Sequence, residues 1–254
     1  MTDAHRSAIL DQFTRQATPF STSPGIRDEA ALKLVIDFSG AGPSDTVLDV
    51  ACGPGILACA FSRVAKHVTG IDITPAMLEK ARALQTEQRL TNLTWDLGDA
   101  SPLPYPDGAF TLVTSRFAFH HFLDPRAVLA EMARVCAPGG TVLLIDAAPP
   151  PDKADAFNRM EKLRDPSHAR ALPPDEQRAL FAAVGLPAPR TTTYRLDGEM
   201  QGLLTRSFPN AGDGEKIRKI FEDALADDAL GLQVHRDGDT IRFSYPVAVL
   251  AARR

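Results

Sequence analysis

The chain has 254 residues and a formal net charge of −4, because 32 aspartates and glutamates outnumber 28 lysines and arginines. Hydrophobic residues make up 44% of the chain and charged residues 24%, a balance typical of globular proteins that bury a core without disulfides. The acidic balance and the scattered basic residues argue against a protein that binds nucleic acid. No apolar stretch reaches the roughly 18 residues of a membrane-spanning helix.

Two further features bear on location and metal binding. Residues 1–16 mix charged and polar side chains, which a secretory signal peptide would not do. The three cysteines form no Cys-x-x-Cys pair, so neither a disulfide framework nor a zinc site is indicated. We therefore expect a cytoplasmic protein with no bound metal.

In the first 150 residues, short runs of aliphatic and β-branched residues alternate with helical patterns. The predicted helices are 28–38, 56–65, 75–84 and 124–136, and the predicted strands are 46–50, 68–72, 93–97, 110–114 and 141–146. Apolar strands that alternate with single helices predict a doubly wound, mostly parallel α/β sheet covered on both faces. Ligands of such sheets bind beyond the carboxyl ends of the strands, where the strand order switches.

The second half of the chain is less regular. Three prolines at 149–151 interrupt it, and the pattern then predicts helices at 154–163, 174–184 and 217–230 and strands at 191–196 and 241–250. Pro246 lies inside the last predicted strand, although proline lacks the N–H group that a central strand needs.

The strongest functional signal is the segment 47–55, Val-Leu-Asp-Val-Ala-Cys-Gly-Pro-Gly, where a strand leads through small residues into a helix. Gly53 and Gly55 allow a ligand to approach the backbone closely, and the helix start offers free N–H groups. Asp72 ends the next strand about 20 residues later, the spacing of a carboxylate that binds ribose hydroxyls. Asp99 follows the third strand in the same way.

The turn is compatible with two kinds of nucleotide ligand, which are alternative interpretations. Residues 53–58 match the dinucleotide pattern G-x-G-x-x-A, which favours an NAD(P)-dependent oxidoreductase. However, Asp49 and Asp99 add negative charge near the turn, and like charges about 4 Å apart repel by about 4 kcal/mol at an effective dielectric near 20. A cationic adenosyl compound, S-adenosylmethionine, suits this turn better than a pyrophosphate. An oxidoreductase of this kind would also need a catalytic tyrosine-lysine pair near the fourth and fifth strands, and the sequence has none placed there.

The motifs at 47–55, 70–72, 98–100 and 138–140 resemble those of the class I S-adenosylmethionine-dependent methyltransferases. Within that family the chain is similar to the branch of ubiquinone and menaquinone biosynthesis methyltransferases. The resemblance implies a seven-stranded Rossmann-like sheet with an antiparallel last strand, in which a bulge would accommodate Pro246. It also implies a helical substrate lid inserted after the fifth strand.

The resemblance also implies which residues bind the cofactor. Asp49 and the turn would hold the methionine end, Asp72 the ribose, and Asp99 the adenine amino group. Ala51 stands where the family more often has glycine, and Phe20 where it often has a lid tyrosine. The full expected set is Phe20, Asp49, Ala51, Cys52, Gly53, Gly55, Asp72, Ile73, Met77, Asp99, Ala100 and Ser115.

The methyl acceptor is expected beside the segment 115–122, which follows the fourth strand. Acceptors that lose a proton need a general base, and histidine is the usual one near neutral pH. His120, His121 and His168 are the candidates, although His121 is as readily a packing or capping residue and the loop 164–168 as readily a surface turn. The expected acceptor-binding residues are Arg116, Phe117, His120, Arg164, Asp165 and His168.

These features together predict one methyltransferase domain. We expect N-terminal helices that cover the cofactor at 1–40, a cofactor-binding core at 41–148, a substrate lid at 149–189 and 198–232, and the last strands at 190–197 and 240–252. The expected partner is a small, apolar or aromatic methyl acceptor bound by a monomer or homodimer. A non-catalytic S-adenosylmethionine-binding protein is the alternative of a different class.

Overall fold

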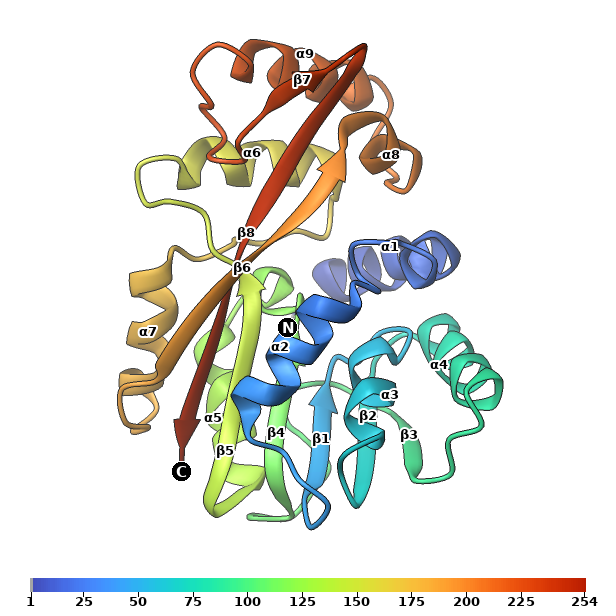
Figure 1. The fold of residues 1–254 in the computed structure, drawn as a ribbon, viewed down its shortest axis with the longest axis vertical. Coiled ribbons are helices and arrows are strands. Elements are labelled where there is room, and N and C mark those ends of the chain that lie inside the picture. Colours follow the sequence, from blue (N-terminus) through green and yellow to red (C-terminus); the bar gives the residue numbers. More distant parts are fainter. Residues whose placement is uncertain (1) are drawn as a thin grey trace.

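A computed structural model describes residues 2–254 of the chain, and its centre is one twisted sheet (Figure 1). The strands follow the order β3-β2-β1-β4-β5-β8-β6, and β7 pairs only with β8. The strands are β1 (Thr46–Val50), β2 (His67–Asp72), β3 (Leu93–Leu97), β4 (Phe110–Arg116), β5 (Cys136–Ala147), β6 (Arg190–Glu199), β7 (His235–Asp237) and β8 (Thr240–Arg253).

The helices pack in two layers and an outer group. They are α1 (Asp3–Ser21), α2 (Glu29–Ser39), α3 (Ile56–Ser62), α4 (Pro75–Glu87), α5 (Pro125–Val135), α6 (Ala154–Arg164), α7 (Pro174–Ala183), α8 (Met200–Thr205) and α9 (Asp213–Ala224), with a 3-10 turn, η1 (Phe119–His121). Strands β1 to β5 are parallel, whereas β8 runs antiparallel to both β5 and β6. The predicted doubly wound sheet with an antiparallel last strand is confirmed, and the short β7 is an addition.

Alternate residues of the central strands enter two different cores. In β5, Leu144 packs in the cluster that contains Leu129 of α5 and Phe181 of α7. Leu143, its neighbour in sequence, packs in the cluster that contains Val35 of α2 and Phe61 of α3. This arrangement explains why the strands are apolar throughout, because both faces of the sheet are covered.

The outer group lies beyond the end of β5. The last register pair of β5 with β8 is Ala147 with Val247, but β6 and β8 stay paired as far as Glu199 with Arg242. This extended ribbon carries α6, α8 and α9, which share a third apolar cluster, and Figure 1 shows them together above the sheet.

Pro246 causes no bulge, so that expectation was wrong. Its register with Arg195 is continuous, and its carbonyl accepts from the Ala148 N–H at 2.9 Å. The missing N–H therefore falls at the last rung beside β5, where the ladder ends and only one hydrogen bond is lost.

The predicted helix at 217–230 is also misplaced, because α9 begins at Asp213 and ends at Ala224. Gly212, with φ 81°, sets its start, and the later apolar residues Leu230 and Leu232 are buried in a turn instead.

Candidate functional site

Two adjoining cavities lie at the carboxyl ends of the parallel strands. The first, called here the sheet-edge cavity, has a volume of about 100 Å³ beside β1, β2 and β4, with a pocket of about 30 Å³ next to it at Asp49. The second, called the outer cavity, has a volume of about 350 Å³ between α1, α6, β6, α8 and β8. Four residues line both cavities and separate them: Phe13, Phe20, Phe117 and His121.

The turn after β1 holds the carboxylate of Asp72 in place. Asp72 Oδ2 accepts from the Gly53 N–H and Oδ1 from the Thr74 N–H, both at 2.8 Å. Burial raises the pKa of Asp72, whereas these N–H groups lower it. Ala51 has φ 55°, the left-handed conformation that favours glycine, which accounts for the family's preference at this position.

Asp49 and Arg116 face the small pocket with unsatisfied polar atoms. Asp49 is 1% exposed, and its Oδ2 has no hydrogen-bond partner among the described residues. Arg116 is 9% exposed; its Nη1 donates to the Ile26 carbonyl at 3.0 Å, while Nε and Nη2 have no partner within residues 2–254. Burial raises the pKa of Asp49 to about 8, with Asp72 adding to this and Arg116 opposing it. Unpaired buried groups are costly, so this pocket suits a ligand that carries both a cation and an anion.

Helix α1 covers the sheet-edge cavity. Ile9 and Phe13 line it, and Arg6 makes a 2.9 Å ion pair with Asp99 at the far side. His5 Nε2 is 2.7 Å from the carbonyl oxygen of His121, which holds the same end of the helix over η1.

His120 in the outer cavity is oriented by a carboxylate. Its Nδ1 donates to Asp146 Oδ1 at 2.6 Å, and its backbone N–H donates to Asp146 Oδ2 at 2.9 Å. Burial alone would lower the pKa of His120, but the carboxylate of Asp146, with Glu161 nearby, raises it. The other ring nitrogen, Nε2, has no hydrogen-bond partner in the described part of the chain. The contact with Asp146 thus fixes the orientation of the His120 ring in the cavity wall.

The other two histidines are held neutral. His121 is 5% exposed, and Nδ1 lies 3.2 Å from the Ser167 carbonyl; burial and the neighbouring His120 lower its pKa to about 3. His168 is 1% exposed, and Nε2 donates to Asn158 Oδ1 at 2.8 Å; burial, His120 and His121 lower its pKa strongly. Its ring centre is 5.5 Å from that of His120. Of the three histidines, His120 is the one whose ring donates to a carboxylate and whose pKa is raised.

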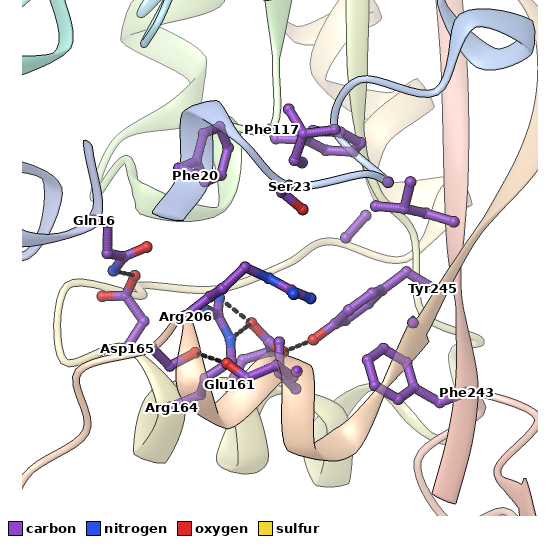
Figure 2. A pocket seen from close by; sticks show the side chains of 18 of the residues that line it. Gln16, Phe20, Ser23, Phe117, Glu161, Arg164, Asp165, Arg206, Phe243 and Tyr245 are labelled. Carbon is purple, nitrogen blue, oxygen red and sulfur yellow. Dashed lines mark hydrogen bonds and ion pairs between the residues drawn. The ribbon is translucent and has the colours of Figure 1, made fainter. Parts of the chain in front are cut away.

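A buried network forms the floor of the outer cavity (Figure 2). Arg164 Nη2 donates to Glu161 Oε2 at 2.6 Å, and the Tyr245 hydroxyl donates to Glu161 Oε1 at 2.5 Å. Asp165 accepts from Gln16 Nε2 at 2.9 Å and also from the N–H and hydroxyl of Ser167. Arg164 and Asp165, which the sequence suggested as acceptor-binding residues, line the outer cavity, and the carboxylate of Asp165 joins α1 to the segment after α6.

Most of the predicted cofactor residues meet at one place. The sheet-edge cavity and its side pocket contain Phe20, Asp49, Ala51, Cys52, Gly53, Asp72, Ile73, Met77, Asp99 and Ala100. Of the predicted acceptor residues, Phe117, His120, Arg164, Asp165 and His168 line the outer cavity.

Three predicted residues depart from their expected positions. Arg116 lines the sheet-edge cavity and its side pocket rather than the outer cavity. Ser115 lies buried inside β4 and lines none of these cavities. Gly55 does not line them either; a Cβ there would lie 2.6 Å from Trp95, so the glycine serves the packing of α3 against that ring.

The sequence did not single out Tyr245, Glu161 or Arg206, which line the outer cavity, or Asp146, which contacts His120. Asp146 was detectable, because it ends a predicted strand as Asp72 does. The others come from elements that are distant in sequence, and no local pattern marks them.

Residues 2–254 contain neither a metal-binding group of side chains nor a helix suited to span a membrane. No three histidine, cysteine or acidic side chains are grouped there as a metal site would require. Likewise, none of the helices described combines the length and the apolar character needed to cross a bilayer.

Comparisons with known proteins agree with this geometry. A family model described as a methyltransferase domain matches residues 48–144. An uncharacterized methyltransferase, YcgJ of Bacillus subtilis, is 38% identical over 237 residues, which cover 89% of this chain and 94% of that protein. A demethylmenaquinone methyltransferase of Deinococcus radiodurans is 42% identical over 106 residues, 41% of this chain and 44% of that protein.

A solved structure shows the same fold. The crystal structure of the Bacillus subtilis YcgJ protein superimposes with a TM-score of 0.81 and 29% sequence identity, covering 89% of this chain and 98% of that one. The chain therefore belongs to the class I S-adenosylmethionine-dependent methyltransferases, is similar over part of its length to the menaquinone biosynthesis enzymes, and is an enzyme that uses S-adenosylmethionine as its cofactor.

Proposed function

We propose that the enzyme methylates a small, apolar or aromatic molecule that binds in the outer cavity and loses a proton to His120. The observation that carries the proposal is the 2.6 Å bond between His120 Nδ1 and Asp146, which leaves Nε2 free at the cavity wall. Aromatic rings of Phe13, Phe117 and Phe157 in the same wall favour an apolar acceptor.

The sheet-edge cavity suits S-adenosylmethionine by the chemistry of its donors. The unpartnered Asp49 carboxylate would bind the ammonium group of the methionine end, and the free Nε and Nη2 of Arg116 its carboxylate. Asp72 would accept from the ribose hydroxyls while Gly53 and Thr74 keep it in position. When bound, the cofactor supplies a methyl group on a sulfonium, and transfer leaves the C–S electron pair on sulfur.

The chain itself contributes orientation and a proton acceptor. The partition of Phe13, Phe20, Phe117 and His121 borders both cavities, so it would set the direction in which the acceptor meets the methyl group, and this orientation is the main catalytic effect. His120 Nε2 takes the acceptor's proton as the new bond to carbon forms, and Asp146 stabilises the resulting imidazolium.

The placing of cofactor and acceptor in the two cavities also suggests which segments of the domain serve each of them. We infer that α1 and α2 cover the cofactor and that residues 149–189 and 198–232 form the wall of the acceptor cavity. Helices α6 and α8, which contribute to the outer cavity, support the second division.

Release of S-adenosylhomocysteine tests the proposal. A screen of phenols, quinols, thiols and heterocycles should identify an acceptor, and His120→Ala should then lower kcat about 100-fold or more while cofactor affinity stays within twofold. Because His120 must be neutral to act and its pKa is raised, wild-type kcat should rise with pH beyond the usual titration range of histidine. Asp146→Asn should move that rise to lower pH and reduce the plateau. A flat pH profile, or a His120→Ala variant with normal kcat, would refute the role of the base.

A further inference from the structure

One cation of the outer cavity has no counter-charge. Arg206 follows α8 and is half-buried, and among residues 2–254 no carboxylate oxygen lies within 4.0 Å of its guanidinium nitrogens and none accepts a hydrogen bond from them. Figure 2 shows its side chain reaching from α8 into the middle of the cavity, toward Tyr245. A Cβ at Gly202 would lie 3.1 Å from Arg206 Nη1, so the guanidinium lies over α8 where the chain leaves room for it.

The other charged side chains that line the outer cavity have ion-pair or hydrogen-bond partners within the protein, with one exception. The pairs are Arg164 with Glu161 at 2.6 Å, Arg242 with Asp237 at 2.7 Å, Asp165 with Gln16 and Ser167, and Asp197 with Ser244. The exception is Glu199, which precedes α8 and lies more than 4.0 Å from the nitrogens of Arg206.

A guanidinium in such a wall needs an acceptor for its N–H groups. Leu203, Phe157 and Phe243 line the same cavity and offer no acceptor to the N–H groups of this half-buried guanidinium. The planar fork of arginine matches a carboxylate, which accepts two parallel hydrogen bonds.

We propose that the methyl acceptor is an aromatic carboxylate whose carboxyl group binds Arg206. This deepens the proposed function and depends on it: the ring would lie between the phenylalanines, with the atom to be methylated near His120. A carboxylate fits better than a phosphate monoester, because the other two arginines of the described wall, Arg164 and Arg242, are already paired and a second negative charge would have no partner.

A matched pair of probes tests the proposal on the full chain saturated with S-adenosylhomocysteine. 3,4-Dihydroxybenzoate and its methyl ester differ only in the charged group, and isothermal titration calorimetry measures the affinity of each. Wild type should bind the acid at least tenfold more tightly than the ester, as expected for charge-assisted hydrogen bonds. Arg206→Gln should abolish this preference, and Arg206→Lys should restore part of it.

Arg236→Gln provides the matched control, because it removes the same charge from the exposed strand β7 outside the cavity. That variant should keep the preference for the acid. A wild type that binds the acid no more tightly than the ester, or binds neither, overturns the proposal, as does an Arg206→Gln variant that weakens both probes equally. Release of S-adenosylhomocysteine with neutral phenols in that case would show that the methyltransferase function stands while the carboxylate assignment fails.

Discussion

At the scale of single residues, the most specific feature of this enzyme is the pair of opposite ionisable groups in the small pocket next to the sheet-edge cavity. Asp49 and Arg116 are both buried and both have polar atoms without partners among the described residues, which a zwitterionic ligand would satisfy. The sequence suggested Asp49 for this role but assigned Arg116 to the acceptor. In the structure, Arg116 ends β4 and its guanidinium stacks on the Phe117 ring at 4.6 Å. It therefore faces the small pocket beside Asp49 and does not line the outer cavity.

The role of Arg116 can be measured with two ligands. Arg116→Gln should weaken binding of S-adenosylhomocysteine about 10- to 100-fold, because a charge-assisted hydrogen bond to the carboxylate is lost. Binding of 5′-methylthioadenosine, which lacks the amino-acid part, should stay within twofold. Calorimetric titration of both ligands gives the comparison, with the exposed Arg126→Gln as the control. Equal losses for the two ligands would mean that Arg116 only supports the fold.

Asp49 should couple cofactor binding to proton release. Its pKa near 8 without ligand means that the carboxyl is mostly protonated at neutral pH, whereas a bound ammonium group favours the ionised form. Affinity should therefore rise with pH up to about 8 and then level off. Titrations in buffers of different ionisation enthalpy would detect the released proton, and Asp49→Asn should abolish its release. Binding that releases no proton in the wild type would contradict this.

At the scale of elements, α1 is tied down unequally along its length. Its first turn is held by the part-exposed pair of Arg6 with Asp99, whereas the bond from Gln16 to Asp165 is buried. Exposed ion pairs contribute about 1 kcal/mol or less, but a buried carboxylate that loses its donor costs about 1–3 kcal/mol. The N-terminal half of α1 is therefore the easier part to open.

This difference predicts the kinetics of cofactor exchange. Arg6→Ala should raise both the association and dissociation rates of S-adenosylhomocysteine about threefold or more and change stability by less than about 1 kcal/mol. Gln16→Ala should instead lower stability by about 1–3 kcal/mol. Stopped-flow binding and urea unfolding separate the two effects. Unchanged association in Arg6→Ala would show that this ion pair does not limit entry.

At the scale of the whole molecule, cofactor binding should stabilise the fold. S-adenosylhomocysteine at 100 times its Kd adds about 2.7 kcal/mol, which raises the Tm by roughly 5–10 °C for a chain of this size. NADH should leave the Tm unchanged, since the carboxylates of Asp72 and Asp99 oppose a pyrophosphate. Asp72→Ala should remove most of the shift while the variant remains folded. Thermal shift measurements of the two proteins with both nucleotides provide the test.

The sequence predicted the parts of the molecule that depend on neighbouring residues. The turn from Ala51 to Gly55 and the carboxylates Asp72 and Asp99 follow single strands, so local pattern and the rule for parallel sheets sufficed to bring them together. The pairing of His120 with Asp146 joins two elements, which no local pattern reveals. The walls built by α6, α8 and β8 arise from packing around the extended ribbon, and the continued apolar pattern after α9 led to a helix that was too long.

The aromatic partition has a further consequence for turnover. Phe13 and Phe20 belong to α1, so one helix borders both cavities. A movement of α1 away from the sheet would open both at once, so that the two products could leave in the same step.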